Sequence, residues 1–262
     1  MASLPIIECE NVTKHFYLYE HRTTSLQEFF VRTVLRRPIH VRHAHFTLTD
    51  FDLRVHQGES IALIGENGSG KSTALRLIAG IYPPTSGTII RRGRVVAVIE
   101  LGAAFHPEPT GAENVRLYAA ALGLSRKEIA THYDEIIAFA DVEDFIGMPT
   151  KHYSSGMAAR LAFSVAVCSR PDVLLLDEVL SVGDERFRRR CLERIAQFQA
   201  DRGTVIFVSH DLEMVRRICS RAVWIARGAI RQTDNVDVVV DAYCAAVGGE
   251  FQAPPRPSVR LA

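Results

Sequence analysis

The sequence of 262 residues lacks any apolar run as long as a membrane-spanning helix needs, about 18 residues. It also lacks an excess of charge of either sign, because 31 Lys and Arg stand against 30 Asp and Glu, for a net charge of +1. That balance gives no overall attraction to nucleic acid or anionic lipid, so we expect no nucleic-acid partner. The N-terminus has neither the basic nor the apolar segment of a secretory signal. We therefore expect the chain to stay in the cytosol and to reach a membrane only through a partner.

Cysteine is scarce, and no C-x-x-C pair occurs. The five cysteines are scattered at Cys9, Cys168, Cys191, Cys219 and Cys244. This arrangement favours reduced, structural thiols. The sequence shows no internal repeat, and its hydrophobic fraction of 47% is ordinary for a globular protein. The length suits one large domain or two small lobes.

The most informative segment that is present runs from Gly65 to Ser72 and fits the phosphate-loop pattern G-x-x-x-x-G-K-[ST]. Glycines let the backbone curl so that its N–H groups point at phosphate oxygens. Lys71 can reach the β- and γ-phosphates, and the Ser72 hydroxyl can coordinate Mg²⁺. The residues expected around bound ATP are Gly65, Asn67, Gly68, Ser69, Gly70, Lys71, Ser72 and Thr73.

The context of this loop supports the prediction. Residues 60–64 read as a short buried strand before it, and residues 73–79 read as a helix after it that Gly80 ends. The N-terminus of such a helix adds the positive end of its dipole to an anion site. Strand, loop and helix therefore follow each other in the order that phosphate binding requires.

Apolar runs and alternating runs predict the fold class. Four unalternated runs, at 60–64, 95–99, 173–176 and 205–208, predict strands of a parallel sheet covered by helices on both faces. The alternation of Phe51, Leu53 and Val55 predicts a half-exposed antiparallel strand, and residues 222–226 and 229–233 predict a hairpin. Residues from about 111 to 170 carry helical periodicity. We predict an α/β phosphate-loop ATPase core with a mixed parallel sheet, an antiparallel β flap and an inserted helical lobe.

Two acids follow the apolar strand 173–176. Asp177 stands at the sheet edge where ligands bind, and it is predicted to hold Mg²⁺ together with Ser72. Glu178 is the candidate general base for the attacking water. His210 follows the next buried strand and is the candidate sensor of the γ-phosphate and that water. The predicted catalytic residues are Glu178, His210 and Lys71.

A second anion-binding helix terminus is predicted at residues 153–157. Ser155 is a natural N-cap there, and Gly156 begins an amphipathic helix that Pro171 ends. Ser154, Ser155 and Gly156 are therefore candidate phosphate contacts. If this terminus cannot reach the first site within one chain, it must serve another chain.

Three other segments leave alternatives open. Residues 18–46 form an extra insertion, with a short helix at 26–35 and a basic, His-rich stretch after it. This stretch is either a solvated surface, a contact for a membrane partner or lipid phosphates, or a metal site. The arginine-rich run at 186–194 is either a solvated helix face or a contact for phosphate or an acidic partner. Residues 248–262 predict a disordered tail.

Together these segments resemble an ABC-transporter ATP-binding subunit over residues from about 6 to 248. Tyr153–Met157 is similar to the family's signature L-S-G-G-Q, with departures at three of five positions, and Ser181–Asp184 resembles its D-loop. His210 matches the switch histidine. The resemblance assigns adenine stacking to Phe16, with Tyr17 or Tyr19 as alternatives.

One departure from the family is large. The glutamine that normally follows the second core strand is missing, and Leu101 or Glu100 stands in its place. The string from Glu100 to Asn114 resembles polysaccharide exporters, which move O-antigen, capsule or teichoic-acid chains on lipid carriers. Some members carry a C-terminal sugar-binding domain, and the resemblance implies export without one for this chain.

The resemblance implies the following assembly. A nucleotide-binding domain at 1–247 would form a head-to-tail homodimer, use ATP and Mg²⁺, and drive a transmembrane permease from the cytoplasmic face of the inner membrane. Contact with the permease is expected around Glu100–Glu108 and through the basic insertion. The alternatives are export of another lipid or small molecule, a soluble family member that acts on ribosomes or DNA, and an ATP binder that does not hydrolyse.

Overall fold

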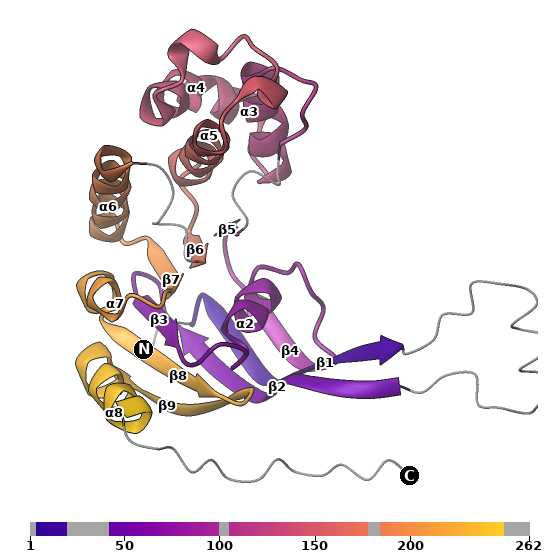
Figure 1. Cartoon of the computed structure of the whole chain (residues 1–262), viewed down its shortest axis with the longest axis vertical. Coiled ribbons are helices and arrows are strands. Elements are labelled where there is room, and N and C mark those ends of the chain that lie inside the picture. The colour runs from indigo at the N-terminus through magenta and orange to yellow at the C-terminus, as the bar shows by residue number, and fades with distance from the viewer. Residues whose placement is uncertain (1–3, 20–41, 100–104, 178–183, 249–262) are drawn as a thin grey trace, which may run out of the picture.

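The computed structural model describes residues 4–19, 42–99, 105–177 and 184–248, and all structural statements refer to these. Figure 1 shows a sheet-containing body with a lobe of helices at one end of the molecule. No helix in the described ranges has the length and apolar character needed to cross a membrane. The predicted helix 26–35, Glu100, Leu101 and Glu178 lie outside these ranges, as do residues 181–183 and 249–262.

A six-stranded sheet forms the centre of the body. Its strands, in order across the sheet, are β5 (Val95–Val98), β6 (Val173–Asp177), β7 (Thr204–Val208), β3 (Ser60–Ile64), β8 (Arg221–Ala226) and β9 (Ala229–Asn235). The first five are parallel, and β9 pairs antiparallel with β8 through the predicted hairpin. The mixed, mostly parallel sheet is therefore confirmed.

Both faces of this sheet are covered, which explains the unalternated apolar runs. Leu174 and Leu176 of β6 face one hydrophobic core, while Val173 and Leu175 face the other. Figure 1 shows α6 (Glu185–Ala200), α7 (Leu212–Ile218) and α8 (Val236–Gly248) along one face. The second face packs against α2 (Lys71–Ile78) and against the antiparallel sheet.

The prediction of burial on both faces is wrong for one strand. β5 is one of the two edge strands of the sheet, and Val95 and Ala97 are only half-buried while Val96 and Val98 are buried. Its composition does not differ from that of the central strands, and only its position at the edge sets its exposure. The predicted helix 73–79 also begins two residues earlier, at Lys71.

The antiparallel flap is a separate three-stranded sheet in the order β2-β1-β4. Its strands are β1 (Ile7–Tyr19), β2 (Arg42–Val55) and β4 (Ser86–Arg91). Phe51, Leu53 and Val55 are buried, and the residues between them are exposed, as the alternation predicts. Both β1 and β2 extend into the predicted insertion 18–46, so the described residues at its two ends are strands.

The helical lobe consists of α3 (Gly111–Ala121), α4 (Arg126–Ala140) and α5 (Ser155–Cys168), with 3₁₀ turns η1 (Glu143–Phe145) and η2 (Thr150–His152) before α5. Capping boxes begin α3 and α4, from Thr110 with Glu113 and from Ser125 with Glu128. Hydrogen bonds from Ser125 and Arg94 lower the pKa of Glu128 to about 2. That capping carboxylate is therefore charged throughout the physiological pH range.

Candidate functional site

Three neighbouring parallel strands end in one row. Asp177 of β6 pairs with Val208 of β7, and Val208 pairs with Leu63 of β3. Gly65 comes two residues after Leu63 of β3, and His210 comes two residues after Val208 of β7. Because parallel strands share one carboxyl edge, the phosphate loop, Asp177 and the residues after β7 emerge together, as ligand sites of open α/β sheets do.

The backbone of the phosphate loop takes conformations that glycine alone adopts readily. Gly65, Gly68 and Gly70 have φ angles of +149°, +76° and +111°. Gly70 is also the N-cap of α2, which begins at Lys71 directly after the loop. The loop therefore turns tightly between a buried strand and a helix N-terminus, which is the arrangement that binds anions.

Gly65→Ala is expected to weaken ATP binding by about fivefold to 150-fold, because backbone strain of this kind costs about 1–3 kcal/mol and the loop must shift to relieve it. A Cβ at Gly65 would lie 2.2 Å from the carbonyl oxygen of Ile225. Titration with a fluorescent ATP analogue measures the effect. The matched control is Gly123→Ala, where φ is also positive (+87°) but no atom lies within 4 Å of the new Cβ. Equal ATP affinity in the two variants would contradict the prediction.

Two polar side chains of the loop are buried. Lys71 is 6% exposed, and its Nζ donates to the carbonyl oxygens of Gly65 (2.8 Å) and Glu66 (2.9 Å). Ser69 is 5% exposed, and its Oγ has no hydrogen-bond partner within the described residues. A buried hydroxyl needs such a partner, and a phosphate oxygen would supply one. A buried ammonium, a buried hydroxyl and a curled backbone fit a triphosphate.

The turn between β8 and β9 is hydrogen-bonded to the phosphate loop. The sequence does not predict this contact. Gly228 N donates to Ser69 O over 2.9 Å, and Thr49 N of β2 donates to Gly228 O over 2.7 Å. The Arg227-Gly228 pair signals a hairpin turn, but nothing local says which loop the turn will touch. The loop is thus held by the sheet on one side and by its own helix on the other.

The predicted metal ligands and two of the predicted catalytic residues, Lys71 and His210, lie at the same sheet edge. Ser72 is the second residue of α2, and Asp177 is the last residue of β6. A hydroxyl and a carboxylate form a donor set that suits Mg²⁺, which takes few protein ligands and uses substrate phosphate oxygens for the rest. His210 is exposed, one residue before Asp211, the N-cap of α7. Glu178 lies outside the described residues.

The signature terminus begins α5, but its cap differs from the prediction. Ser154, not Ser155, is the N-cap, and its Oγ accepts a hydrogen bond from Met157 N over 3.1 Å. Both serines are exposed, and Gly156 is half-buried. As residue types, the two serines suit the N-cap position equally well, and only the backbone geometry selects Ser154. Figure 1 shows α5 in the lobe, away from β3 and α2 of the same chain.

Phe16, the predicted adenine contact, lies in an aromatic cluster on the antiparallel sheet. Its ring meets Tyr82 edge to face, with 5.5 Å between centroids. Lys14 Nζ lies 5.2 Å from the Phe16 centroid and donates to Pro83 O over 2.7 Å. Nothing in the local sequence connects Tyr82 with Phe16, 66 positions away. The side chains of Tyr17 and Tyr19 lie outside the described residues.

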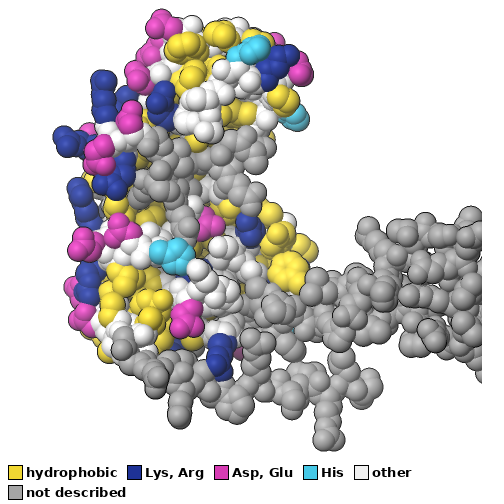
Figure 2. Space-filling view, viewed as in Figure 1, with side chains coloured by type: hydrophobic (Ala, Val, Ile, Leu, Met, Phe, Trp, Pro, Cys, Tyr) yellow, Lys and Arg dark blue, Asp and Glu magenta, His cyan; other side chains and the backbone are white. Residues whose placement is uncertain are grey.

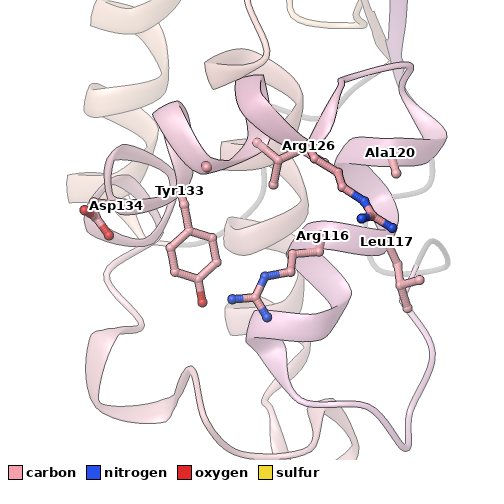
Figure 3. A pocket seen from close by; sticks show the side chains of 8 residues that line it. Arg116, Leu117, Ala120, Arg126, Tyr133 and Asp134 are labelled. Carbon is pink, nitrogen blue, oxygen red and sulfur yellow. The ribbon is translucent and has the colours of Figure 1, made fainter.

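A pocket of about 640 Å³ opens between α3 and α4 of the lobe. Leu117, Ile129 and Tyr133 line it, and Leu117 is 52% exposed. Figure 3 shows Arg116 reaching toward the Tyr133 ring, with its guanidinium carbon 5.2 Å from the ring centroid, and Arg126 beside Leu117. The lobe thus carries an apolar recess with cationic groups at its rim. Figure 2 also shows a broad notch between the lobe and the body.

Known proteins are similar to this chain over most of its length. A family model described as ABC transporter matches residues 48–181. The O-antigen export system ATP-binding protein RfbB of Klebsiella pneumoniae is 41% identical over 91% of this chain and 97% of its own length. The teichoic acids export ATP-binding protein TagH of Staphylococcus saprophyticus subsp. saprophyticus is 38% identical over 90% of this chain and 87% of its own length.

Solved structures share the fold. The ATP-binding subunit of an ABC transporter superposes with a TM-score of 0.71 at 23% identity, over 91% of this chain and 93% of that one. A dimeric ATP-binding cassette in a post-hydrolysis state, bound to ADP and Pi, superposes with a TM-score of 0.69 at 22% identity, over 88% of this chain and 98% of that one. The α/β fold with an inserted helical lobe is therefore confirmed.

Proposed function

This chain belongs to the ABC transporter family and is the ATP-hydrolysing subunit of a transporter, and we propose that this transporter exports a lipid-linked polysaccharide across the cytoplasmic membrane. The observation that carries this proposal is similarity to export subunits for O-antigen and for teichoic acid over about nine-tenths of the chain. O-antigen, capsule or teichoic-acid chains are the substrate class. Another lipid or a small molecule is the alternative.

The arrangement within one chain supports a head-to-tail homodimer of residues 1–247. The phosphate loop lies in the body, whereas Ser154, Ser155 and Gly156 lie in the lobe of the same chain (Figure 1). Two chains facing each other would bring the lobe of one to the loop of the other. ATP would then join both subunits, because its negative charge is shared by two sets of donors.

The residues have distinct roles in hydrolysis. Lys71 and the loop N–H groups hold the β- and γ-phosphates, while Phe16 stacks on adenine. Ser72 and Asp177 would hold Mg²⁺, which would neutralise phosphate charge when bound. Glu178 accepts a proton from the attacking water, and His210 orients that water toward the γ-phosphorus. The water oxygen bonds to the γ-phosphorus as the bond from this phosphorus to the bridging oxygen breaks, and the proton on Glu178 passes to phosphate or solvent. ADP and phosphate then leave, and loss of the γ-phosphate removes the group that both subunits contacted.

The permease would dock on the helical lobe. The pocket between α3 and α4 offers apolar surface at Leu117, and Arg116 and Arg126 complement an acidic helix. Glu108, the last residue of the predicted contact segment Glu100–Glu108, pairs with Lys151 of the lobe over 2.8 Å. This docking keeps the subunit peripheral, at the cytoplasmic face of the inner membrane. Lipid phosphates near the basic insertion would strengthen it.

A complementation experiment tests the proposal. In cells that lack this chain, lipid-linked polysaccharide is expected to accumulate inside and to disappear from the surface, and the wild-type chain is expected to restore export. Leu117→Asp is expected to restore at least about tenfold less export than the wild-type chain, because docking would bury its charge against the apolar residues of the permease helix. The purified variant is expected to keep its ATPase activity. Surface polysaccharide and phosphate release are the two measurements.

The matched control is Val238→Asp, an equally exposed apolar residue (49%) on α8 of the body. It is expected to restore export as the wild type does. Normal polysaccharide export in the deletion strain would refute the substrate class. Full export with Leu117→Asp would refute docking at the pocket.

A further inference from the structure

The segment that leads into the signature is bound to the start of α3. Gly111 N donates to Met148 O (3.0 Å), and Ala112 N donates to Ile146 O (2.9 Å). Thr150 N donates to Pro109 O over 3.0 Å. The connection from α4 to α5 therefore wraps around the N-terminus of α3 rather than standing free in solvent.

Tyr153 ends this segment and fits closely against α3. Its hydroxyl donates to Phe145 O over 2.8 Å, and its backbone N donates to Thr150 O over 3.0 Å. A Cβ at Gly111 would lie 2.1 Å from the Tyr153 oxygen and 3.0 Å from Cζ, so only glycine leaves room for the phenol. Burial raises the pKa of Tyr153, which keeps the hydroxyl protonated as a donor.

This contact lies one residue from the proposed phosphate site. Tyr153 directly precedes Ser154, the N-cap whose Oγ accepts from Met157 N. We propose that Tyr153 is a positioning residue: its hydroxyl, held by Phe145 O, sets the direction in which the α5 terminus meets the triphosphate bound to a second copy of the chain. The inference rests on the proposed homodimer. It assigns no contact between Tyr153 and the nucleotide.

Tyr153→Phe tests this inference, because it removes the hydroxyl and keeps the ring. In a Glu178→Gln background, which would trap ATP, analytical ultracentrifugation measures the dimer dissociation constant at saturating ATP. A lost hydrogen bond is expected to cost about threefold to tenfold in affinity at each site. Because the dimer contains two such sites, we expect the dissociation constant to rise about tenfold or more.

Two further measurements separate positioning from folding. ATP affinity of the monomer, measured below the dimerisation range, is expected to stay unchanged in Tyr153→Phe, since the phosphate loop lies in the body. Tm is expected to fall by no more than a few degrees, the usual effect of one lost hydrogen bond. Tyr118→Phe is the matched control, because Tyr118 is another partly buried tyrosine of the lobe, packed on Phe105 with 5.9 Å between ring centroids. It is expected to leave the dimer unchanged.

Gly111→Ala tests the same contact independently. It is expected to weaken the dimer by displacing the phenol, and Tyr153→Phe in the same chain is expected to restore part of that loss, because the 2.1 Å contact disappears with the hydroxyl. Equal dimerisation of Tyr153→Phe and its parent would overturn this inference alone. A parent that stays monomeric with ATP would overturn the homodimer and this inference together.

Discussion

Lys71→Ala is expected to reduce ATP turnover to background, a loss of at least about a hundredfold, because preorganised charge at the transferring phosphoryl group is a large part of phosphoryl-transfer catalysis. Lys71 is buried in the loop, where its ammonium donates to the carbonyl oxygens of Gly65 and Glu66. Alanine removes both the charge and these donors. Phosphate release measures turnover, and titration with a fluorescent ATP analogue measures binding.

The control for this variant is Lys127→Ala, on the exposed side of the first turn of α4. It removes the same side chain from the helical lobe and is expected to leave the turnover of the purified subunit unchanged. Thermal unfolding of both variants separates loss of chemistry from loss of the fold. Normal turnover with Lys71→Ala would overturn the assignment of the phosphate loop.

Glu178→Gln is expected to lower turnover by about 10²–10⁴-fold, the usual contribution of a general base, and to leave a stable dimer in ATP. Glu178 follows Asp177, the last residue of β6, at the edge where β3 and β7 also end. Glutamine keeps the size of the side chain but cannot take a proton from water. Phosphate release and sedimentation in ATP or in ADP measure the two effects.

Glu185→Gln is the matched control, because Glu185 is an exposed carboxylate in the first turn of α6, close in sequence. It is expected to hydrolyse ATP at the wild-type rate and to form no trapped dimer. Undiminished turnover with Glu178→Gln would remove Glu178 from its proposed role. A variant that is inactive but monomeric in ATP would instead count against the homodimer.

The parts of the site that could be predicted are those written in contiguous residues. The phosphate loop needs glycines, a lysine and a serine at fixed spacing between a strand and a helix, and each requirement is local. The apolar runs of β3, β6 and β7 predict central parallel strands, so the shared edge of Asp177 and Gly65 followed from the same reasoning. The alternation in β2 indicated its exposed face for the same local reason.

The parts that could not be predicted depend on contacts between distant residues. The half-buried state of Val95 follows from the edge position of β5, which its composition does not encode. Ser154 and Ser155 are equivalent as cap residues, and the path of the segment around α3 selects Ser154. The pocket at Leu117 is lined by residues of both α3 and α4, so it exists only where the fold brings these two helices together.

By itself, the chain's order of residues determined that this is a phosphate-loop ATPase, because binding a triphosphate makes demands on neighbouring residues that few other sequences meet. Tertiary structure alone decided how that loop is supported and where the second anion site points. Gly228 contacts Ser69 across 159 positions of the sequence. Tyr153 contacts Gly111 across 42 positions and Phe145 across 8. Such contacts depend on how sheets and helices pack, and packing is a property of the whole fold.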